Sequence, residues 1–257
     1  MQSNSTTKPL DALESDPHRM AWMVGTPPPR EKLVRFDDGS MLRFPENRWA
    51  NSNYRNLVAT KVISCGQGPV APLVRAERSD LDALIFNPIG STSPMRWDQS
   101  LLTNYTDGIV VLHHGKVVYE KYLGALNADT PHIAFSVTKS FFGSIAACLV
   151  YEGLIEETAL VSKYVPELAA SGFGDATVRQ VLDMTTALDY SEDYTDPNAG
   201  IWSHARAGGL LFRPPQYHGP DNFYDFLTTV KKHGVHGANF SYKTINTDVL
   251  GLSLIHI

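Results

Sequence analysis

The chain has 257 residues, of which 43% are hydrophobic, and its formal net charge is -5. This length can bury a sizeable core in one large domain or two small ones, and the acidic balance excludes a basic surface for nucleic acid or for a membrane. No stretch approaches the roughly 20 apolar residues of a membrane span, and residues 1–7 lack the basic and apolar regions of a signal peptide. We therefore expect a soluble, cytoplasmic protein.

The N-terminal third of the chain shows little periodic structure. Residues 1–95 are rich in Pro, Asn, Ser and Arg, and we expect them to form an arm packed on the domain that follows. Within the arm, Asp38-Gly39 at the centre of residues 36–44 predicts a small hairpin. Only Cys65 and Cys148 are present, too few for a disulfide framework, so both are expected to be free thiols, with Cys148 buried.

The first convincing secondary structure is an antiparallel hairpin over residues 108–122, where two β-branched runs flank a short loop containing glycine. The loop contains His113 and His114, but adjacent strand residues point to opposite faces, and no carboxylate or Cys cluster accompanies them. His233 and His236 lie in a glycine-bearing loop that offers no third ligand. We predict no metal site.

A serine and a lysine stand three residues apart at the start of an apolar run that ends near Gly153, which suits a helix C-terminal cap. On a helix, residues i and i+3 share a face, so Lys139 can reach the hydroxyl of Ser136. Serine becomes a nucleophile only when a base takes its proton. An exposed Ser and Lys on an ordinary helix are the simpler interpretation of this spacing alone.

Lysine acts as a base only where its charged form is disfavoured. Burial against Phe135, Phe141 and Phe142 would lower the pKa of Lys139, and the positive end of the helix acts in the same direction. Apolar residues on nearly all sides of the run predict a buried core helix that begins at Ser136.

Helices dominate the rest of the chain. Residues 160–168 predict a short helix stopped at Pro166, and Thr177 with Gln180 forms a capping box at the start of another. Residues 190–220 are polar and aromatic, as in a loop that contacts substrate. Residues 221–232 predict a further helix. No other hydrolase, metalloprotease or nucleotide-binding signature competes with Ser136.

Several segments together resemble the serine β-lactamase-like family, which includes class C β-lactamases and penicillin-binding-protein-like enzymes. Within it the chain is most similar to the 6-aminohexanoate-dimer hydrolases, which degrade nylon oligomers and are related to family VIII carboxylesterases. The resemblance covers residues 46–251. The segments that carry it are Ser136-Val137-Thr138-Lys139, Tyr242-Lys243-Thr244-Ile245-Asn246, Asn47-Arg48-Trp49-Ala50, Tyr164-Val165-Pro166-Glu167-Leu168, Val181-Leu182-Asp183-Met184 and residues 189–197.

The resemblance implies an α+β fold of the β-lactamase/transpeptidase type, with an antiparallel sheet flanked by helices and an all-helical region. Residues 96–251 would be a partial catalytic domain that lacks the C-terminal strands. Residues 252–257 match a translated sequencing adapter, so we expect them to be an artefact, although an amphipathic tail is the alternative. A third family motif and the second oxyanion amide would lie beyond the chain.

By the same resemblance, Ser136 is the acylated nucleophile, Lys139 its base and Tyr242 the group that protonates the leaving atom. Without the resemblance, a core tyrosine would be the simpler interpretation of Tyr242. A phenol shuttles protons near neutral pH only if cations stabilise its phenolate, which Lys139 would do. The Ser136 amide, at a helix start, suits one half of an oxyanion hole.

Three further residues are expected at the substrate. Tyr194 matches a tyrosine that closes over the substrate amide in nylon-oligomer hydrolases, and a ring packed under its loop is the alternative interpretation. Thr244 replaces the Asn of the β-lactamase Tyr-x-Asn motif, which argues against β-lactam recognition. Asn246 matches a later Asn of the family and has a structural role as its alternative.

We therefore expect a serine hydrolase that cleaves linear amides or esters through an acyl-enzyme on Ser136, with no metal or organic cofactor. A family VIII type carboxylesterase is the alternative among enzymes, and a catalytically silent binding protein is the alternative from another class. The expected partner is a small-molecule substrate rather than nucleic acid or a membrane, and a homodimer stays open.

Overall fold

The computed structural model describes residues 9–256, which group into two compact units that divide between Ile133 and Ala134. Residues 1–7, on which the expectation of no signal peptide rests, lie outside the described residues, as does Ile257. The division follows contacts within the chain and does not test the predicted boundary at residue 95, which stays a prediction. Among residues 9–256, no helix is both long and apolar enough to cross a membrane.

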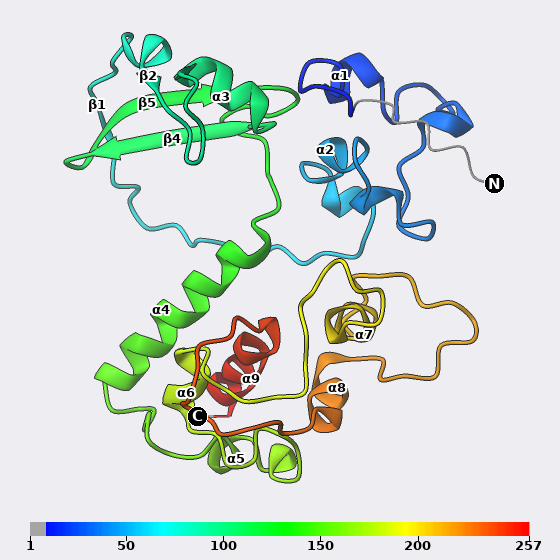
Figure 1. Cartoon of the computed structure of the whole chain (residues 1–257), viewed down its shortest axis with the longest axis vertical. Coiled ribbons are helices and arrows are strands. Elements are labelled where there is room, and N and C mark those ends of the chain that lie inside the picture. Colours follow the sequence, from blue (N-terminus) through cyan, green and yellow to red (C-terminus); the bar gives the residue numbers. More distant parts are fainter. Residues whose placement is uncertain (1–8, 257) are drawn as a thin grey trace. The chain divides into compact units, whose positions relative to one another are not determined.

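The first unit combines short helical turns with two small sheets (Figure 1). Its helical elements are α1 (Pro17–Met20), η1 (Arg30–Lys32), η2 (Ser40–Leu42), α2 (Asn47–Ala50), η3 (Tyr54–Asn56), η4 (Leu81–Ala83) and α3 (Trp97–Thr103). Its strands are β1 (Val74–Arg75), β2 (Ile85–Phe86), β3 (Met95–Arg96), β4 (Gly108–His113) and β5 (Lys116–Tyr122).

The hairpin predicted over residues 108–122 is confirmed. Strands β4 and β5 are antiparallel, with Gly108 opposite Tyr122 and a register shift between Val111 and Leu112. The turn between them contains His114 and Gly115, both with positive φ. Strand β1 adds to the other edge of β5 in parallel, so the three-stranded sheet has the order β1-β5-β4, and β2 pairs with β3 in a second sheet.

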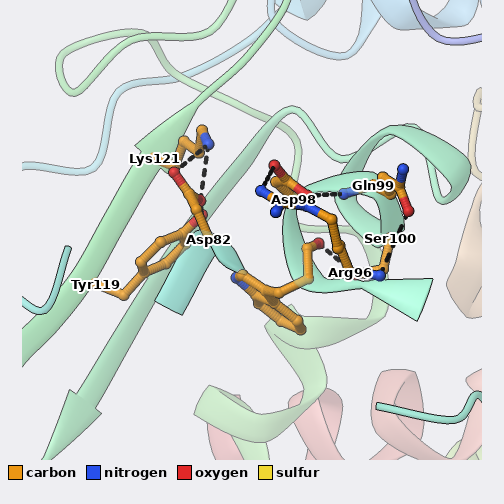
Figure 2. A network of polar contacts seen from close by, with 8 residues as sticks. Asp82, Arg96, Asp98, Gln99, Ser100, Tyr119 and Lys121 are labelled. Atoms are coloured by element: carbon orange, nitrogen blue, oxygen red, sulfur yellow. Dashed lines mark hydrogen bonds and ion pairs between the residues drawn. The ribbon is translucent and has the colours of Figure 1, made fainter. Parts of the chain in front are cut away.

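A polar network ties the loop before β2 to the hairpin (Figure 2). The Asp82 carboxylate accepts hydrogen bonds from the Tyr119 hydroxyl at 2.6 Å and from Lys121 Nζ at 2.9 Å, both on β5. These bonds to a charged acceptor lower the pKa of the Asp82 carboxyl. Because the three residues come from segments almost 40 positions apart, the network fixes the fold of the first unit rather than one local turn.

The hairpin predicted at residues 36–44 is wrong. Ser40–Leu42 is instead the 3-10 helix η2, preceded by Gly39 with φ 71°. The Asp38 carboxylate accepts the Ser40 N–H at 2.8 Å, and the Ser40 hydroxyl oxygen accepts the Arg35 N–H at 2.8 Å. Side chains that bond to the local backbone in this way compete with a strand ladder, so the segment folds as a compact turn.

The second unit is helical over its described residues. Its elements are η5 (Phe135–Val137), α4 (Thr138–Tyr151), α5 (Val161–Tyr164), η6 (Pro166–Leu168), α6 (Val178–Leu182), α7 (Gly200–Ala207), α8 (Phe223–Thr229) and α9 (Thr244–Ile255). Helix α9 contacts α4, α5, α6 and α8, and Figure 1 shows it among them. The fully buried side chains of this core include Ile155, Val161, Val165, Leu168, Phe173, Val178, Leu227, Ile245 and Val249.

Helix α4 is the predicted apolar helix, and Gly153 follows it with φ 74°, but the prediction that it is a buried core helix is wrong. Ala146 is its buried residue, whereas Phe141 is 66% exposed and Ile145 is 52% exposed. Helix α9 covers one side of α4 within this unit. Cys148 is consequently exposed rather than buried, and both cysteines are free as predicted.

The predicted later helices form with shifted ends. Residues 160–168 become α5 and η6, with Pro166 opening η6. The capping box of α6 is confirmed, because the Thr177 and Gln180 side chains each accept the other residue's N–H. The helix predicted over 221–232 is the shorter α8, and the loop predicted over 190–220 contains the helix α7.

Candidate active site

Ser136 lies in the 3-10 turn η5, immediately before α4 begins at Thr138. The preceding residue, Phe135, has φ 40°, a conformation that L side chains rarely adopt. Such strain is found where the surrounding structure holds a functional residue in a fixed direction. The turn therefore presents the Ser136 side chain and amide at the start of a 14-residue helix.

Lys139 reaches Ser136 as the spacing predicts. In this structure Lys139 Nζ donates to Ser136 Oγ at 3.0 Å, which is hydrogen-bond distance for proton transfer in either direction. The apolar enclosure predicted around the amine is not formed by the three phenyl rings, since Phe135 is 54% exposed, Phe141 66% and Phe142 38%. Ser136 and Lys139 are thus paired, but the aromatic burial predicted for Lys139 is wrong.

Tyr242 lies next to this pair, just before α9. Lys139 Nζ is 5.8 Å from the centroid of the Tyr242 ring, within the range of a cation–π contact. The Tyr242 side chain is 43% exposed, so it is not the fully packed core tyrosine of the simpler interpretation. The structure brings all three predicted catalytic side chains together around one amine.

Tyr194 comes from the loop before α7 and packs edge-on against Trp202, with ring centroids 5.8 Å apart. Partial desolvation raises the pKa of the Tyr194 phenol, and the nearby Glu192 and Tyr242 act in the same direction.

Thr244, at the first turn of α9, is held by a residue that the sequence did not single out. Its N–H donates to Glu192 Oε1, and its hydroxyl donates to Glu192 Oε2 at 3.1 Å. Glu192 lies in the segment 189–197 that carries the family resemblance, two positions before Tyr194. The signal in the sequence that could have found Glu192 is an acidic residue two positions before Tyr194, a predicted site tyrosine.

Asn246 is fully buried and has protein partners for its amide. Its Oδ1 accepts from the Thr186 hydroxyl at 2.7 Å, and its Nδ2 donates to Met184 Sδ at 3.5 Å. Lys243 is also buried, and its Nζ donates to the Thr186 carbonyl oxygen at 3.2 Å. Burial lowers the pKa of Lys243, while Glu192 opposes that change. These contacts favour the structural interpretation of Asn246.

A cavity of about 490 Å³ opens beside Lys139. Its lining is Thr138, Lys139 and Phe142 from α4, Phe223 from α8, and Thr247, Asp248, Gly251, Leu252, Leu254 and Ile255 from α9. Neither Ser136 nor Tyr242 is part of this lining. The cavity therefore borders Lys139 and does not enclose Ser136 or Tyr242.

Asp248, which lines this cavity, contacts a buried histidine on α7. The His204 side chain is 2% exposed, and its Nε2 lies 2.7 Å from Asp248 Oδ2. The ring stacks on Phe223 at 4.5 Å between centroids, while Nδ1 has no hydrogen-bond partner within residues 9–256. This pair anchors α7 to α9 behind Lys139.

In the part of the chain that the structure describes, no three His, Cys, Asp or Glu side chains lie close enough together to hold a metal ion. His236 is instead a hydrogen-bonding core residue. Its Nδ1 accepts the Ala187 N–H at 2.9 Å, and its Nε2 lies 3.1 Å from Asp175 Oδ1.

Three comparisons relate the chain to known proteins. A protein-family model described as "Beta-lactamase" matches residues 101–254. The "6-aminohexanoate-dimer hydrolase" of Paenarthrobacter ureafaciens is 37% identical over 208 residues, which cover 80% of this chain and 50% of that protein. A solved structure named "Putative 6-aminohexanoate-dimer hydrolase from Bacillus anthracis" has a TM-score of 0.78 at 27% identity, covering 90% of this chain and 59% of that chain.

These likenesses confirm the predicted α+β fold of the β-lactamase/transpeptidase type. Over the described residues, its sheet is reduced to the small strands of the first unit. The chain spans about half the length of the curated relative that it matches.

Proposed function

Because the chain belongs to the beta-lactamase family, we propose that it is a serine hydrolase that cleaves linear amides or esters through an acyl-enzyme on Ser136. The observation that carries the proposal is the 3.0 Å hydrogen bond between Lys139 Nζ and Ser136 Oγ. The 5.8 Å approach of the same nitrogen to the Tyr242 ring adds the third catalytic group.

In the proposed first step, the neutral Lys139 amine takes the proton of the Ser136 hydroxyl, and Oγ attacks the substrate carbonyl carbon. The negative charge that develops on the carbonyl oxygen faces the Ser136 amide at the helix start. Tyr242 then donates its proton to the leaving nitrogen or oxygen, and the proton held by Lys139 replaces it. The product of this step is the ester of Ser136 with the acyl group.

The second step returns the enzyme to its starting state. A water molecule loses a proton to the Tyr242 and Lys139 pair and attacks the acyl-enzyme carbonyl carbon. The bond to Ser136 Oγ breaks, Oγ regains a proton from Lys139, and the carboxylic acid leaves. The cycle consumes one water molecule and needs no redox change.

A linear amide related to the 6-aminohexanoate dimer is the substrate class that we favour. It is supported by the 37% identity to the Paenarthrobacter ureafaciens protein of that name. The Tyr242-Lys243-Thr244 segment supports it as well, because a hydroxyl replaces the side-chain amide of the β-lactamase Tyr-x-Asn motif. Carboxylester hydrolysis is the second candidate, since the same acyl-enzyme forms from an ester.

A fluorophosphonate probe tests the proposal directly, because it forms a covalent bond only with an activated serine. We expect the full-length protein to be labelled at Ser136 and its Ser136→Ala variant not to be labelled. Ser140→Ala is the matched control, since Ser140 is an exposed serine one turn further along α4, and it should label like the wild type. Unlabelled full-length protein, or labelling that survives Ser136→Ala, would contradict the proposal and favour a silent binding protein.

Hydrolysis of the 6-aminohexanoate dimer, compared with p-nitrophenyl esters of the same acyl chain, then separates amidase from esterase. Four further points stay predictions from the sequence. They are the substrate contacts of Tyr194, Thr244 and Asn246, the absence of cofactors, the cytoplasmic location, and the choice between a monomer and a homodimer.

A further inference from the structure

Glu192 joins two segments of the site that lie far apart in the chain. It is 52 residues before Thr244, and both of its carboxylate oxygens accept hydrogen bonds from that one residue. The contact is bidentate, since one oxygen accepts a hydrogen bond from the backbone N–H and the other accepts one from the side-chain hydroxyl. A contact with two bonds fixes direction as well as distance.

The carboxylate also occupies the N-terminus of α9, where the first amides of a helix have no acceptor of their own. Lys243, the N-cap residue, supplies no side-chain cap. Glu192 takes that role from a distant loop, and its negative charge suits the positive end of a 12-residue helix. The Glu192 contact therefore stabilises the N-terminus of α9, the helix that begins two residues after Tyr242.

The backbone of Lys243 connects Thr244 to Tyr242, so the position of Thr244 constrains that of Tyr242. Its backbone is extended, with φ -143° and ψ 118°. Residues on either side of an extended residue point the same way, so Tyr242 and Thr244 share one side while Lys243 points to the other. The Lys243 side chain is buried there and bonded to Thr186. Fixing Thr244 and Lys243 together leaves Tyr242 little rotational freedom.

We propose that Glu192 is a positioning residue of the reaction, which clamps Thr244 so that Tyr242 is held over Lys139 beside the loop that carries Tyr194. The inference rests on the proposed hydrolase function and adds to it a residue that does not touch the reacting atoms. Tyr194 is two positions after Glu192, and Tyr242 is two positions before Thr244, so the clamp links both tyrosines.

The charge of Glu192 separates the tasks of the two phenols. Desolvation of the ring raises the pKa of Tyr194, and the charge of Glu192 acts in the same direction, which suits Tyr194 to act as a hydrogen-bond donor. Tyr242 instead has Lys139 Nζ 5.8 Å from the centroid of its ring. The site thereby holds one phenol as a donor and the other where a proton can be exchanged.

The test compares Glu192→Gln with Asp193→Asn in the whole chain. The glutamine keeps the shape of Glu192 but replaces one accepting oxygen with an NH₂ group. Asp193 is the neighbouring carboxylate, and its oxygen accepts from Thr195 at 2.6 Å and 2.9 Å within the same loop. Each variant is assayed on a p-nitroanilide, on the p-nitrophenyl ester of the same acyl group, and with the fluorophosphonate probe.

These three readouts depend differently on Tyr242. An anilide nitrogen must be protonated to leave, whereas nitrophenolate and fluoride are weak bases that leave without a proton. We expect Glu192→Gln to lower anilide turnover by about 10- to 100-fold, since a misplacement of about 1 Å can have that effect. Ester turnover and labelling should change by less than about threefold, and Asp193→Asn should leave all three unchanged.

Thr244→Val shows whether the effect passes through the clamp. Combined with Glu192→Gln, it should lower anilide turnover no further than Glu192→Gln alone, because both changes break the same contact. Hydrogen exchange of the peptide that spans residues 242–250 should accelerate in Glu192→Gln and not in Asp193→Asn, independently of activity.

The outcomes separate the two claims. If the wild type is labelled at Ser136 but Glu192→Gln matches Asp193→Asn in exchange and anilide turnover, the clamp is refuted and the hydrolase stands. An equal loss in all three readouts would also refute it, because that indicates general damage to the site. If the wild type is unlabelled while exchange still responds to Glu192→Gln, the proposed function fails and Glu192 has a structural role alone.

Discussion

Lys139 Nζ hydrogen-bonds Ser136 Oγ at 3.0 Å and lies 5.8 Å from the centroid of the Tyr242 ring. One amine therefore contacts both Ser136 and Tyr242. Arginine in its place would stay protonated and could not accept the proton of the Ser136 hydroxyl. We expect Lys139→Arg to lower labelling by a fluorophosphonate and hydrolysis of the nitrophenyl ester by about 10²- to 10⁴-fold, the usual contribution of a general base.

Lys163→Arg is the control for that change. Lys163 is an exposed lysine on α5 whose Nζ pairs with Glu156 at 2.6 Å. A surface pair of this kind contributes little, so labelling should match the wild type. Lys139→Arg with unchanged labelling at Ser136 would show that another group takes the serine proton.

Tyr242→Phe tests the proton shuttle. The phenyl ring keeps the contact with the Lys139 side chain but has no hydroxyl to protonate a leaving nitrogen. We expect anilide hydrolysis to fall by at least about 10²-fold, while fluorophosphonate labelling changes by less than about threefold. Because Tyr242 is 43% exposed, the thermal unfolding temperature should stay the same. Equal losses with both reagents would contradict the shuttle and would indicate that Tyr242 only orients Ser136.

The elements that could be predicted from sequence are those whose signals are local. The spacing of Ser136 and Lys139, the two runs of the 108–122 hairpin and the Thr177 capping box each depend on residues a few positions apart, and all three form. Periodicity and capping chemistry act within one turn or one strand pair, so a single sequence contains them in full.

The errors occur where several local signals compete or where burial decides. Asp38-Gly39 suits a hairpin turn, but Ser40 bonds to the backbone of Arg35 and stabilises a helical turn instead. The apolar pattern of α4 predicts burial, yet burial depends on what covers a helix. Within the second unit, α9 covers only part of it, so Phe141 and Cys148 are exposed.

Glu192 illustrates what sequence reasoning missed in the site. Its partner Thr244 is 52 residues away, and no spacing rule connects a loop carboxylate with the start of a helix at that separation. Asn246 shows the same limit, because its buried hydrogen bond with Thr186 spans 60 residues. Tertiary contacts of this kind become visible only when the fold brings the segments together.

Asn246→Ala should act on stability rather than on catalysis. It removes the acceptor of the buried Thr186 hydroxyl and leaves that group unsatisfied, which costs about 1–3 kcal/mol. Urea unfolding at neutral pH measures the change, and anilide turnover per folded molecule should stay within about twofold. Thr186→Val is the matched variant from the other side of the bond. Lost turnover in a fully stable Asn246→Ala protein would instead support the predicted contact with substrate.

The contact between Asp175 and Lys232 makes the stability of the second unit depend on pH. Its carboxylate accepts a hydrogen bond from Lys232, which lowers the pKa of Asp175, and the nearby His236 acts in the same direction. A lowered folded-state pKa means that the unfolded chain binds the proton more readily. The stabilisation is therefore present above the unfolded value of about 3.9 and is lost as the pH falls through the lower folded value.

We expect Asp175→Asn to remove this part of the acid dependence of unfolding. Because the Asp175 side chain is 61% exposed, solvent screens the pair and the loss at pH 7 should be below about 1 kcal/mol. Urea unfolding of the wild type and the variant should therefore give free energies that differ at pH 7 and converge below about pH 3. Glu152→Gln, at the exposed C-terminal end of α4, is the control. A constant difference between wild type and Asp175→Asn at every pH would show that the contact stabilises the fold by packing rather than by charge.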